Sequence, residues 1–385
     1  MNPLVNPGPA LSGAEAVRYS RHLSLPGFGD DGQRRLRAAR VLVVGAGGLG
    51  APVLQYLVAA GVGRITVIDD DVVEASNLQR QVLHREADLG RPKAESACDA
   101  ALRLDSASRV TAIVGRLDAD NALDLFASHD LVVDGSDNFA TRYLSNDAAE
   151  ITGTPLVWGT IFRFEGQVSV FWPGQGPMLR DLFPDIPDAD SVPNCAEGGV
   201  LGVLCGTIGS AMATEAVKVL CGIGEPMVGR LMIYDALAAG YTFLTLAEDP
   251  DREKVTALAS DYAFSCAVET PVTEVSAEEL AAERTGSQRP APLVLDVRED
   301  WERGIVSIPD DHWVPLGRIR QDGWDAVAGV LADSSGNPPA EVVVYCKAGV
   351  RSAEAVRLLT AGAPAGTRLR SLAGGVLAVP GAPRY

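Results

Sequence analysis

The sequence predicts an α/β protein with two units, each built on a parallel β-sheet. In the first unit, the apolar run Val41–Val44 enters a glycine-rich turn, and apolar residues at helical spacing follow over 53–58. In the second, the apolar run Val342–Tyr345 leads into a loop that opens at Cys346 and precedes a helical pattern. A strand, a short connection and a helix form the repeating unit of parallel sheets. The length of 385 residues suits two or three domains, since a domain takes roughly 150 residues.

The glycine-rich turn is the first candidate for a binding site. It brings backbone N–H groups and a helix N-terminus to one point, an arrangement that holds phosphate oxygens. Asp69 ends the next apolar run, Ile65–Ile68, about twenty residues further on, where an acidic side chain can hold a ribose hydroxyl. The glycines assigned to nucleotide binding are Gly45, Gly47, Gly48 and Gly50. Up to this point the pattern suits NAD and ATP equally well.

A polar segment, Asp71–Lys93, favours one of the two nucleotides. It is too polar and irregular for a plain crossover helix, and it holds Asn77, Arg80 and Gln81. The triphosphate of ATP needs more cations than a nicotinamide cofactor does, and arginine forks and lysine point charges supply them. The segment therefore favours a nucleoside triphosphate.

Ser136, Asp137 and Asn138 follow a third apolar run, Leu131–Val133. Because the carboxyl ends of parallel strands face one crevice, these side chains are expected beside the glycine-rich turn. Mg²⁺ is usually held by one or two carboxylates together with phosphate oxygens. We therefore predict that Asp137 is the Mg²⁺ ligand of an ATP site.

Ordered motifs from about residue 15 to about residue 245 resemble the MoeB/ThiF branch of the ubiquitin-activating superfamily, in particular its MoeZ-type members with a rhodanese domain behind this unit. The motifs are Arg18–His22, the glycine-rich turn, Ser76–Gln81, Lys93, Asp134–Asn138 and Asn194–Gly199. The resemblance implies a Rossmann-like adenylation domain that uses ATP and Mg²⁺ to adenylate the C-terminal Gly-Gly carboxylate of a small ubiquitin-like sulfur-carrier protein, which then becomes a thiocarboxylate. The residues predicted to contact ATP or Mg²⁺ are Gly48, Asp69, Asn77, Leu78, Arg80, Gln81, Lys93, Asp137 and Asn138.

Arg21 lies upstream of the nucleotide-binding pattern. The resemblance implies that it reaches into the active site of a partner subunit and stabilises charge on the transferring phosphate, so that the site is complete only in a homodimer. An arginine supplied in trans can raise a rate by several powers of ten. Without the resemblance, a surface arginine is the favoured interpretation, because most arginines are exposed.

The six cysteines lack even spacing, so we expect no disulfide framework. Cys98, Cys205 and Cys221 lie among small and apolar residues and are interpreted as buried and structural. Cys195 lies in a predicted loop before the acidic and glycine residues 197–199. The resemblance implies that it resolves a disulfide or acyl intermediate, and the alternative is a loop thiol with no role.

Cys346 opens the loop between a strand and a helix, where N–H groups and the helix dipole stabilise a thiolate or persulfide, and Arg351 adds positive charge. The loop resembles the rhodanese active site, as the flanking signatures Asp296–Glu299 and Leu372–Gly375 also do. A cysteine phosphatase is the alternative, but its loops usually hold one residue more between Cys and Arg than the four found here. Persulfide sulfur, loaded from thiosulfate or a cysteine desulfurase, is therefore expected on Cys346.

The predicted domains are adenylation over 1–250, a linker over 251–290 and a rhodanese-like sulfurtransferase over 291–385. A flexible linker spans roughly 5–6 Å × √n for n residues, so the second domain could bring its thiol to the first site. Many relatives hold Zn²⁺ with two Cys-x-x-Cys pairs. The corresponding stretches here are Met178–Asp181 and Ala263–Cys266, which hold one cysteine between them, so we predict no zinc site. We expect that packing by Phe183 and Pro184 stabilises this region in place of the metal.

The composition excludes several classes of protein. A net charge of −17 argues against nucleic acid, whose phosphates would repel this chain. No window holds the ~18 uninterrupted apolar residues of a membrane span. Residues 1–10 lack the basic start and apolar core of a secretory signal, so we expect a cytoplasmic protein without membrane or nucleic-acid partners.

Two alternatives stay open at this point. A NAD-dependent oxidoreductase would explain the glycine-rich turn and Asp69, but it would leave Arg80, Lys93 and Asp137 without a role. A non-catalytic protein with a decayed rhodanese tail would dock the carrier without consuming ATP. The sequence does not distinguish a molybdopterin carrier from a thiamine carrier or from one used in cysteine or secondary metabolism.

Overall fold

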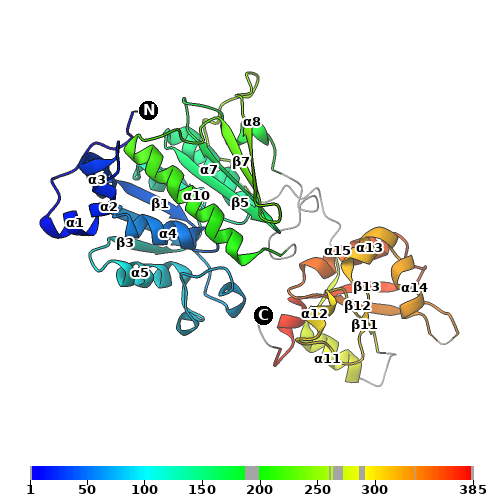
Figure 1. Cartoon of the computed structure of the whole chain (residues 1–385). Helices are drawn as coiled ribbons and strands as arrows, with labels where there is room; N and C mark the ends of the chain where they lie inside the picture. The colour runs from blue at the N-terminus through cyan, green and yellow to red at the C-terminus, as the bar shows by residue number, and fades with distance from the viewer. Residues whose placement is uncertain are drawn as a thin grey trace. The chain divides into compact units, whose positions relative to one another are not determined.

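The computed structural model describes residues 2–186, 199–259, 262, 272–285, 291–333 and 335–382. The chain divides into two compact units, unit 1 over Met1–Cys266 and unit 2 over Ala267–Tyr385. Each unit combines helices with one sheet, which confirms the predicted fold class (Figure 1). The division falls inside the segment 251–290 that the sequence assigns to a linker.

Unit 1 is built on an eight-stranded sheet in the order β3-β2-β1-β4-β5-β6-β7-β8. Its strands are β1 (Arg40–Val44), β2 (Arg64–Asp69), β3 (Val110–Val114), β4 (Leu131–Asp134), β5 (Leu156–Phe162), β6 (Glu165–Phe171), β7 (Arg230–Asp235) and β8 (Gly240–Thr245). The strands from β3 to β5 run parallel, and those from β5 to β8 are antiparallel to their neighbours. β2 and β4 flank β1 on opposite sides, and the crevice at such a switch point is where open α/β sheets bind ligands.

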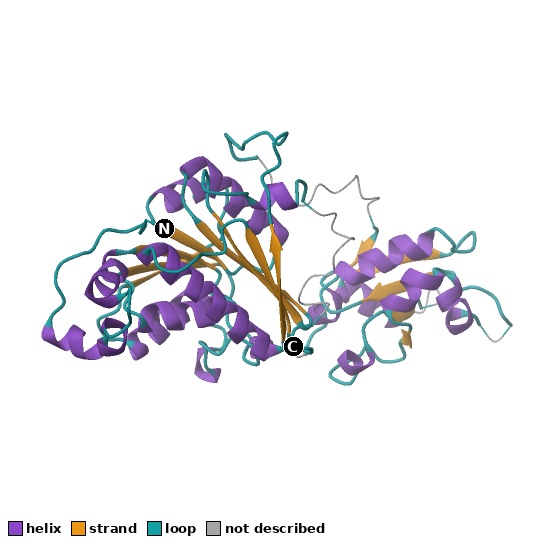
Figure 2. Cartoon of the chain, turned by 45° about the horizontal axis from the view of Figure 1, so that its top comes forward, coloured by secondary structure: helices purple, strands orange, loops and turns teal. Residues whose placement is uncertain are grey.

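Helices cover both faces of this sheet (Figure 2). The helices of unit 1 are α1 (Gly13–Arg18), α2 (Ser20–Leu23), α3 (Gly29–Ala38), α4 (Gly50–Ala59), α5 (Lys93–Leu104), α6 (Ala122–Ala127), α7 (Phe139–Thr152), α8 (Leu179–Leu182) and α10 (Gly202–Cys221). Alternate residues of β1 point to opposite faces: Val41 and Val43 join the core under α3, α4, α5 and α10, whereas Leu42 and Val44 join the core under α6, α7 and α8. Burial on both faces explains the continuous apolar run of β1.

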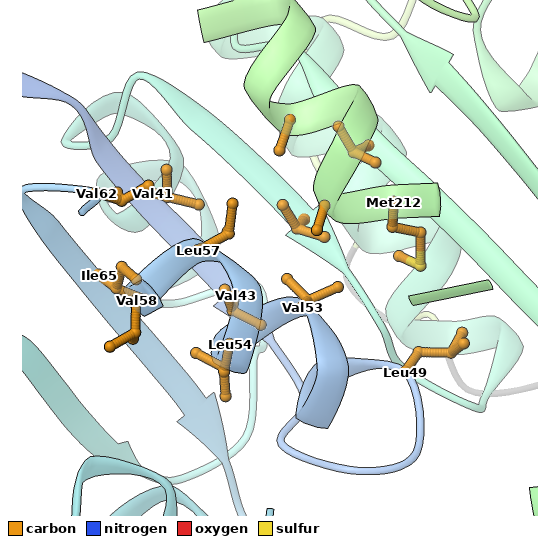
Figure 3. Packing of buried hydrophobic residues seen from close by; sticks show 14 of the residues in the cluster. Val41, Val43, Leu49, Val53, Leu54, Leu57, Val58, Val62, Ile65 and Met212 are labelled. Atoms are coloured by element: carbon orange, nitrogen blue, oxygen red, sulfur yellow. The ribbon is translucent and has the colours of Figure 1, made fainter. Parts of the chain in front are cut away.

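Figure 3 shows the first of these cores, where Val53 and Leu57 of α4 lie over the side chains of β1 and Met212 of α10 joins the same cluster. Among the described residues, α10 is the one helix long and apolar enough to cross a bilayer, and 56% of its apolar window is buried inside the unit. It packs against α4 and β5 as the core helix of this layer.

The polar segment before α5 contains no α-helix, as its composition predicts. It holds two 3₁₀ turns, η1 (Ala75–Asn77) and η2 (Glu86–Asp88). Its ends are tied together, because Lys93 donates its backbone N–H to the carbonyl of Asp71 over 2.9 Å. Because its two ends are hydrogen-bonded to each other, this irregular segment forms a loop that holds polar side chains at the carboxyl end of the sheet.

The brace expected from Phe183 and Pro184 is wrong, because the side chain of Phe183 is 46% exposed. Ion pairs hold the region instead. Arg180 of α8 lies 2.6 Å from Asp147 of α7, and the hydroxyl of Tyr262 donates to the same carboxylate over 2.8 Å. No group of three or more His, Cys, Asp or Glu side chains is placed to hold a metal within the described part of the chain.

A second set of ion pairs ties the start of the expected linker to unit 1. Arg252 lies 2.7 Å from Asp181 and 3.0 Å from Glu150, and all three side chains are at most 13% exposed. Burial alone would raise the pKa of Asp181, but the hydrogen bonds from Arg252 and from nearby backbone N–H groups hold it below its ordinary value. The start of the 251–290 segment is therefore docked on unit 1.

Unit 2 is built on a five-stranded parallel sheet in the order β11-β10-β12-β13-β9. Its elements are β9 (Glu274–Val275), α11 (Ala277–Thr285), β10 (Leu293–Asp296), α12 (Asp300–Arg303), β11 (His312–Trp313), α13 (Leu316–Asp322), α14 (Asp325–Leu331), β12 (Glu341–Tyr345), α15 (Val350–Thr360), β13 (Arg368–Leu372) and the 3₁₀ turn η3 (Gly375–Ala378). β9 and α11 lie inside the predicted linker, yet β9 pairs with β13 and α11 packs on the sheet. The linker is therefore shorter than predicted.

We predict that Arg252→Met destabilises unit 1 by about 3 kcal/mol, because it leaves two buried carboxylates without their cation. The midpoint of the first thermal transition in calorimetry measures the change. Asp31→Asn is the control: its pair with Arg34 spans 3.6 Å and its side chain is 62% exposed, so it should change stability by less than ~0.5 kcal/mol. Equal shifts for the two variants would contradict the role of the ion pairs.

Candidate active sites

A pocket of about 250 Å³ opens at the carboxyl ends of β1, β2 and β4. Nine of the predicted nucleotide-binding residues line it, namely Gly45, Gly47, Gly48, Asp69, Arg80, Gln81, Lys93, Asp137 and Asn138. Gly50, Asn77 and Leu78 are not part of the lining. The sequence thus located residues of one continuous pocket, and two of the remaining three, Gly50 and Asn77, act on its shape.

Gly50 shapes the turn by permitting a close backbone approach. A Cβ atom at this position would lie 1.9 Å from the carbonyl oxygen of Gly45, which no side chain allows. Gly45 itself has φ of 87°, a conformation that favours glycine. Asp69 closes the turn, because its Oδ2 accepts the N–H of Ala46 over 2.7 Å. Burial raises the pKa of Asp69 above its ordinary value.

The cations of the pocket have partners in the chain. Lys93 begins α5, is 7% exposed and places its Nζ 2.6 Å from Oδ2 of Asp71. Arg80 donates from Nη1 to the carbonyl of Ser76 over 3.0 Å. Asn77 accepts the N–H of Glu74 over 3.1 Å and so shapes the η1 turn that precedes Arg80. Lys93 and Arg80 are held at the pocket wall before any ligand arrives.

Asp137 and Asn138 differ in what their side chains do. Asn138 is the N-cap of α7, since its Oδ1 accepts the N–H of Thr141 over 2.9 Å. Asp137 is exposed in the pocket, so its carboxylate, like that of Asp70, is open to a cation on a bound nucleotide. The cap places Asp137 directly after β4 and fixes the direction in which the chain leaves the strand.

Sequence reasoning missed several residues of the pocket. Asp71, Arg116 and Arg142 line it without having been predicted. Arg116 follows β3 at the same edge of the sheet, so the rule that located Asp137 at the end of β4 would also have found Arg116. Arg142 lies on the first turn of α7, where its head donates to the carbonyl of Ser136 over 3.2 Å, and no sequence motif signals that contact.

Arg21 and the cysteines of unit 1 lie away from this pocket or outside the described residues. Arg21 is exposed on α2 and does not line the pocket of its own chain. Cys195 falls outside the described residues. Cys205 and Cys221 are buried as predicted, and Cys98 is half-buried. Burial raises the pKa of Cys98 to about 11 and that of Cys221 to about 12, which keeps both thiols protonated.

The second site lies in unit 2, where β12 ends at Tyr345 and α15 begins at Val350. Cys346 is 1% exposed, and its Sγ accepts the N–H of Gly349 over 3.1 Å. Gly375 closes over the loop, because a Cβ there would lie 2.5 Å from the carbonyl of Cys346. The sulfur thus lies among backbone groups next to a helix N-terminus, as the sequence predicts.

The positive charge of Arg351, which the sequence predicts beside this loop, is paired with a carboxylate. Its two terminal nitrogens bind both oxygens of Glu302 over 2.7 and 2.8 Å. Burial alone would raise the pKa of Glu302, but the bonds from Arg351 hold it below its ordinary value. The buried Arg298, paired with Asp296 over 2.8 Å, supports the same corner of the sheet. The N–H of Gly349 is therefore the donor that the structure places on the sulfur.

The sequence profile of the ThiF family matches residues 19–255, and that of the rhodanese-like domain matches residues 276–379. The chain belongs to the ThiF family. Similar members include the probable adenylyltransferase/sulfurtransferase MoeZ of Mycobacterium tuberculosis, 48% identical over 92% of this chain and 90% of that protein. The adenylyltransferase and sulfurtransferase MOCS3 of Bos taurus is 40% identical over 97% and 87%. A sulfur carrier protein adenylyltransferase of Thermus thermophilus is 54% identical over 61% and 89%.

Solved structures of E. coli MccB share the fold of this ThiF-family chain. One of them superimposes with a TM-score of 0.57 at 20% identity, covering 64% of this chain and 75% of that one. The family overturns the nicotinamide oxidoreductase, since the similar members are named adenylyltransferases. The rhodanese-like match likewise decides against the cysteine phosphatase.

We predict a pH-dependent effect of Glu302→Gln on unit 2. The native pKa of Glu302 lies below its ordinary value of 4.5, so its charge stabilises the fold above that pH and stops doing so as the pH falls through the native pKa. Calorimetry at pH 7 should show the variant about 2 kcal/mol less stable than wild type, and the gap should shrink below pH ~4. Glu354→Gln, in an exposed pair with Arg320, is the control. A gap that is constant with pH would contradict this account.

Proposed function

We propose that this chain is an ATP-dependent adenylyltransferase and sulfurtransferase, which converts the C-terminal Gly-Gly carboxylate of a small ubiquitin-like sulfur-carrier protein into a thiocarboxylate. The observation that carries the proposal is that one chain holds both a cation-lined pocket at the switch point of unit 1 and a cysteine loop before a helix in unit 2. Relatives that are similar over most of the chain are named for both activities.

In the first step the carrier carboxylate attacks the α-phosphorus of ATP, the bond to the β-phosphate oxygen breaks, and pyrophosphate leaves. Lys93 and Arg80 offset the charge that develops on the phosphates. When Mg²⁺ is bound, it would neutralise phosphate charge, and we assign its protein ligand to Asp137, whose carboxylate is exposed in the pocket. Asp69 positions the turn and receives the ribose hydroxyl. The product is an acyl adenylate.

In the second step the persulfide on Cys346 attacks the acyl carbon and AMP leaves with the electrons of the broken C–O bond. The adduct is an acyl disulfide. A second thiol then attacks the Sγ of Cys346, the S–S bond breaks, and the thiocarboxylate leaves. We assign that thiol to Cys195, and an external thiol reductant then reduces the resulting disulfide to two thiols. Thiosulfate or a cysteine desulfurase supplies the sulfur that loads Cys346 as a persulfide.

The proposed enzyme is a cytoplasmic homodimer. Arg21 is exposed on a short helix and does not line its own pocket, which supports a role in the site of a partner subunit. Guanidinium charge supplied in trans would add to that of Arg80. The chain would then adenylate the carrier only as a dimer.

We predict that Asp137→Ala abolishes ATP–pyrophosphate exchange that depends on the carrier, with a loss of at least roughly 100-fold, whereas Cys346→Ala keeps the exchange and loses thiocarboxylate formation. A small Gly-Gly-ending protein captured in the presence of ATP serves as the carrier. Asp124→Ala, an exposed change on α6, is the control for the first variant, and Cys98→Ala is the control for the second. If folded Cys346→Ala also loses exchange, the two sites do not divide the work as proposed.

A further inference from the structure

A buried histidine that the proposed chemistry does not use contacts the glycine-rich turn. His84 is 5% exposed and lies behind the nucleotide pocket rather than in its lining. Its Nε2 lies 2.9 Å from the carbonyl oxygen of Ala46, and its Nδ1 lies 2.8 Å from Oγ of Ser96, a buried residue of α5. The histidine therefore joins the glycine-rich turn to the helix that begins with Lys93.

The partners of His84 decide its protonation. A carbonyl oxygen can only accept, so Nε2 carries the proton and donates it to Ala46. Nδ1 lies within hydrogen-bond distance of the Ser96 hydroxyl, which also bonds the carboxylate of Asp88. Burial lowers the pKa of His84 below its ordinary value and the charge of Lys93 acts in the same direction, although the bond to Ala46 and the charge of Asp88 oppose them. The ring is thus a neutral bridge of fixed orientation.

The bond to Ala46 fixes the direction of one peptide group. In a planar trans peptide the C=O and N–H point to opposite sides, so a carbonyl of Ala46 held by His84 aims the N–H of Gly47 the other way. Gly47 lines the pocket, and within the described ranges no group accepts its N–H. On the preceding peptide, the N–H of Ala46 is bound by Asp69. Both peptides around Ala46 are therefore fixed, one by Asp69 and one by His84.

We propose that His84 is a positioning residue for adenylation, which acts through the Ala46–Gly47 peptide to aim the N–H of Gly47 at a phosphate oxygen of ATP. This inference rests on the proposed use of ATP in this pocket. His84 touches neither nucleotide nor carrier. Because its other nitrogen is bound to Ser96 on α5, it also keeps the turn in register with Lys93 at the start of that helix.

The positions of His84 and Ser96 exclude a catalytic role for these two side chains. Ser96 is fully buried and, like His84, does not line the pocket, so its hydroxyl is not placed to attack a ligand. His84 and Ser96 instead act as supporting residues, which lie behind a binding site and orient a group that lines it. Loss of such an orienting group typically costs roughly 10- to 100-fold.

The test is calorimetric titration of the full-length chain with α,β-methylene ATP, an analogue that cannot release pyrophosphate. His84→Leu should raise the Kd for the analogue roughly 10- to 100-fold while the number of sites per folded chain stays the same. His84→Gln, whose amide can donate to the Ala46 carbonyl, should recover most of that affinity. A role in folding alone would instead lower the number of sites and leave Kd unchanged.

His129 supplies a matched control. It is half-buried in unit 1, both of its ring nitrogens are bonded over 2.7 Å, to Leu125 and Thr66, and it does not line the pocket. Burial lowers its pKa as it does for His84. His129→Leu should keep the wild-type Kd. Equal Kd values for His84→Leu and wild type, or an equal rise in His129→Leu, would overturn the inference; a wild-type chain that does not bind the analogue would overturn the proposed function instead.

Discussion

The nucleotide site depends on the close approach of two backbone segments, the turn after β1 and the turn after β4. A Cβ on Gly135 would lie 3.0 Å from the backbone nitrogen of Gly50, and one on Gly50 would overlap the carbonyl of Gly45. Only glycines allow the two strand ends to come this near. The approach brings the helix N-terminus of α4, the carboxylate of Asp137 and the cations of the 71–93 segment to one pocket. Every other feature of the site is arranged around this contact.

The two units share one local structure, with different charges around it. In both, a buried parallel strand ends in a loop that leads into a helix, an arrangement that suits an anion. In unit 1, Lys93 and Arg80 add cations to that loop, as a polyphosphate requires. In unit 2, Arg351 is bound by Glu302, so the loop around Cys346 relies on backbone N–H groups, which is enough for the single negative charge of a persulfide.

Features set by a local stretch of sequence could be predicted. Contacts between side chains far apart in the chain could not. Cys346, the glycine-rich turn and the irregular segment before Lys93 follow from local pattern, and the structure places them as predicted. The bond of Arg351 to Glu302 and the ion pairs of Arg252 join residues far apart in the chain, so no spacing signals them. Asn138 lines the pocket, and its oxygen also caps α7. Packing by Phe183 was wrong because buried charges hold that region. Roles for Arg21 and Cys195 stay predictions.

The central claim is that carboxylate activation in unit 1 and sulfur delivery from unit 2 are coupled in one chain. Mass spectrometry of the carrier after incubation with ATP, a sulfur donor and the full-length protein tests it most directly. The account predicts that one oxygen of the terminal carboxylate is replaced by sulfur, only with ATP present and only when both Asp137 and Cys346 are intact. Sulfur incorporation without ATP, or by a chain that lacks Cys346, would contradict it.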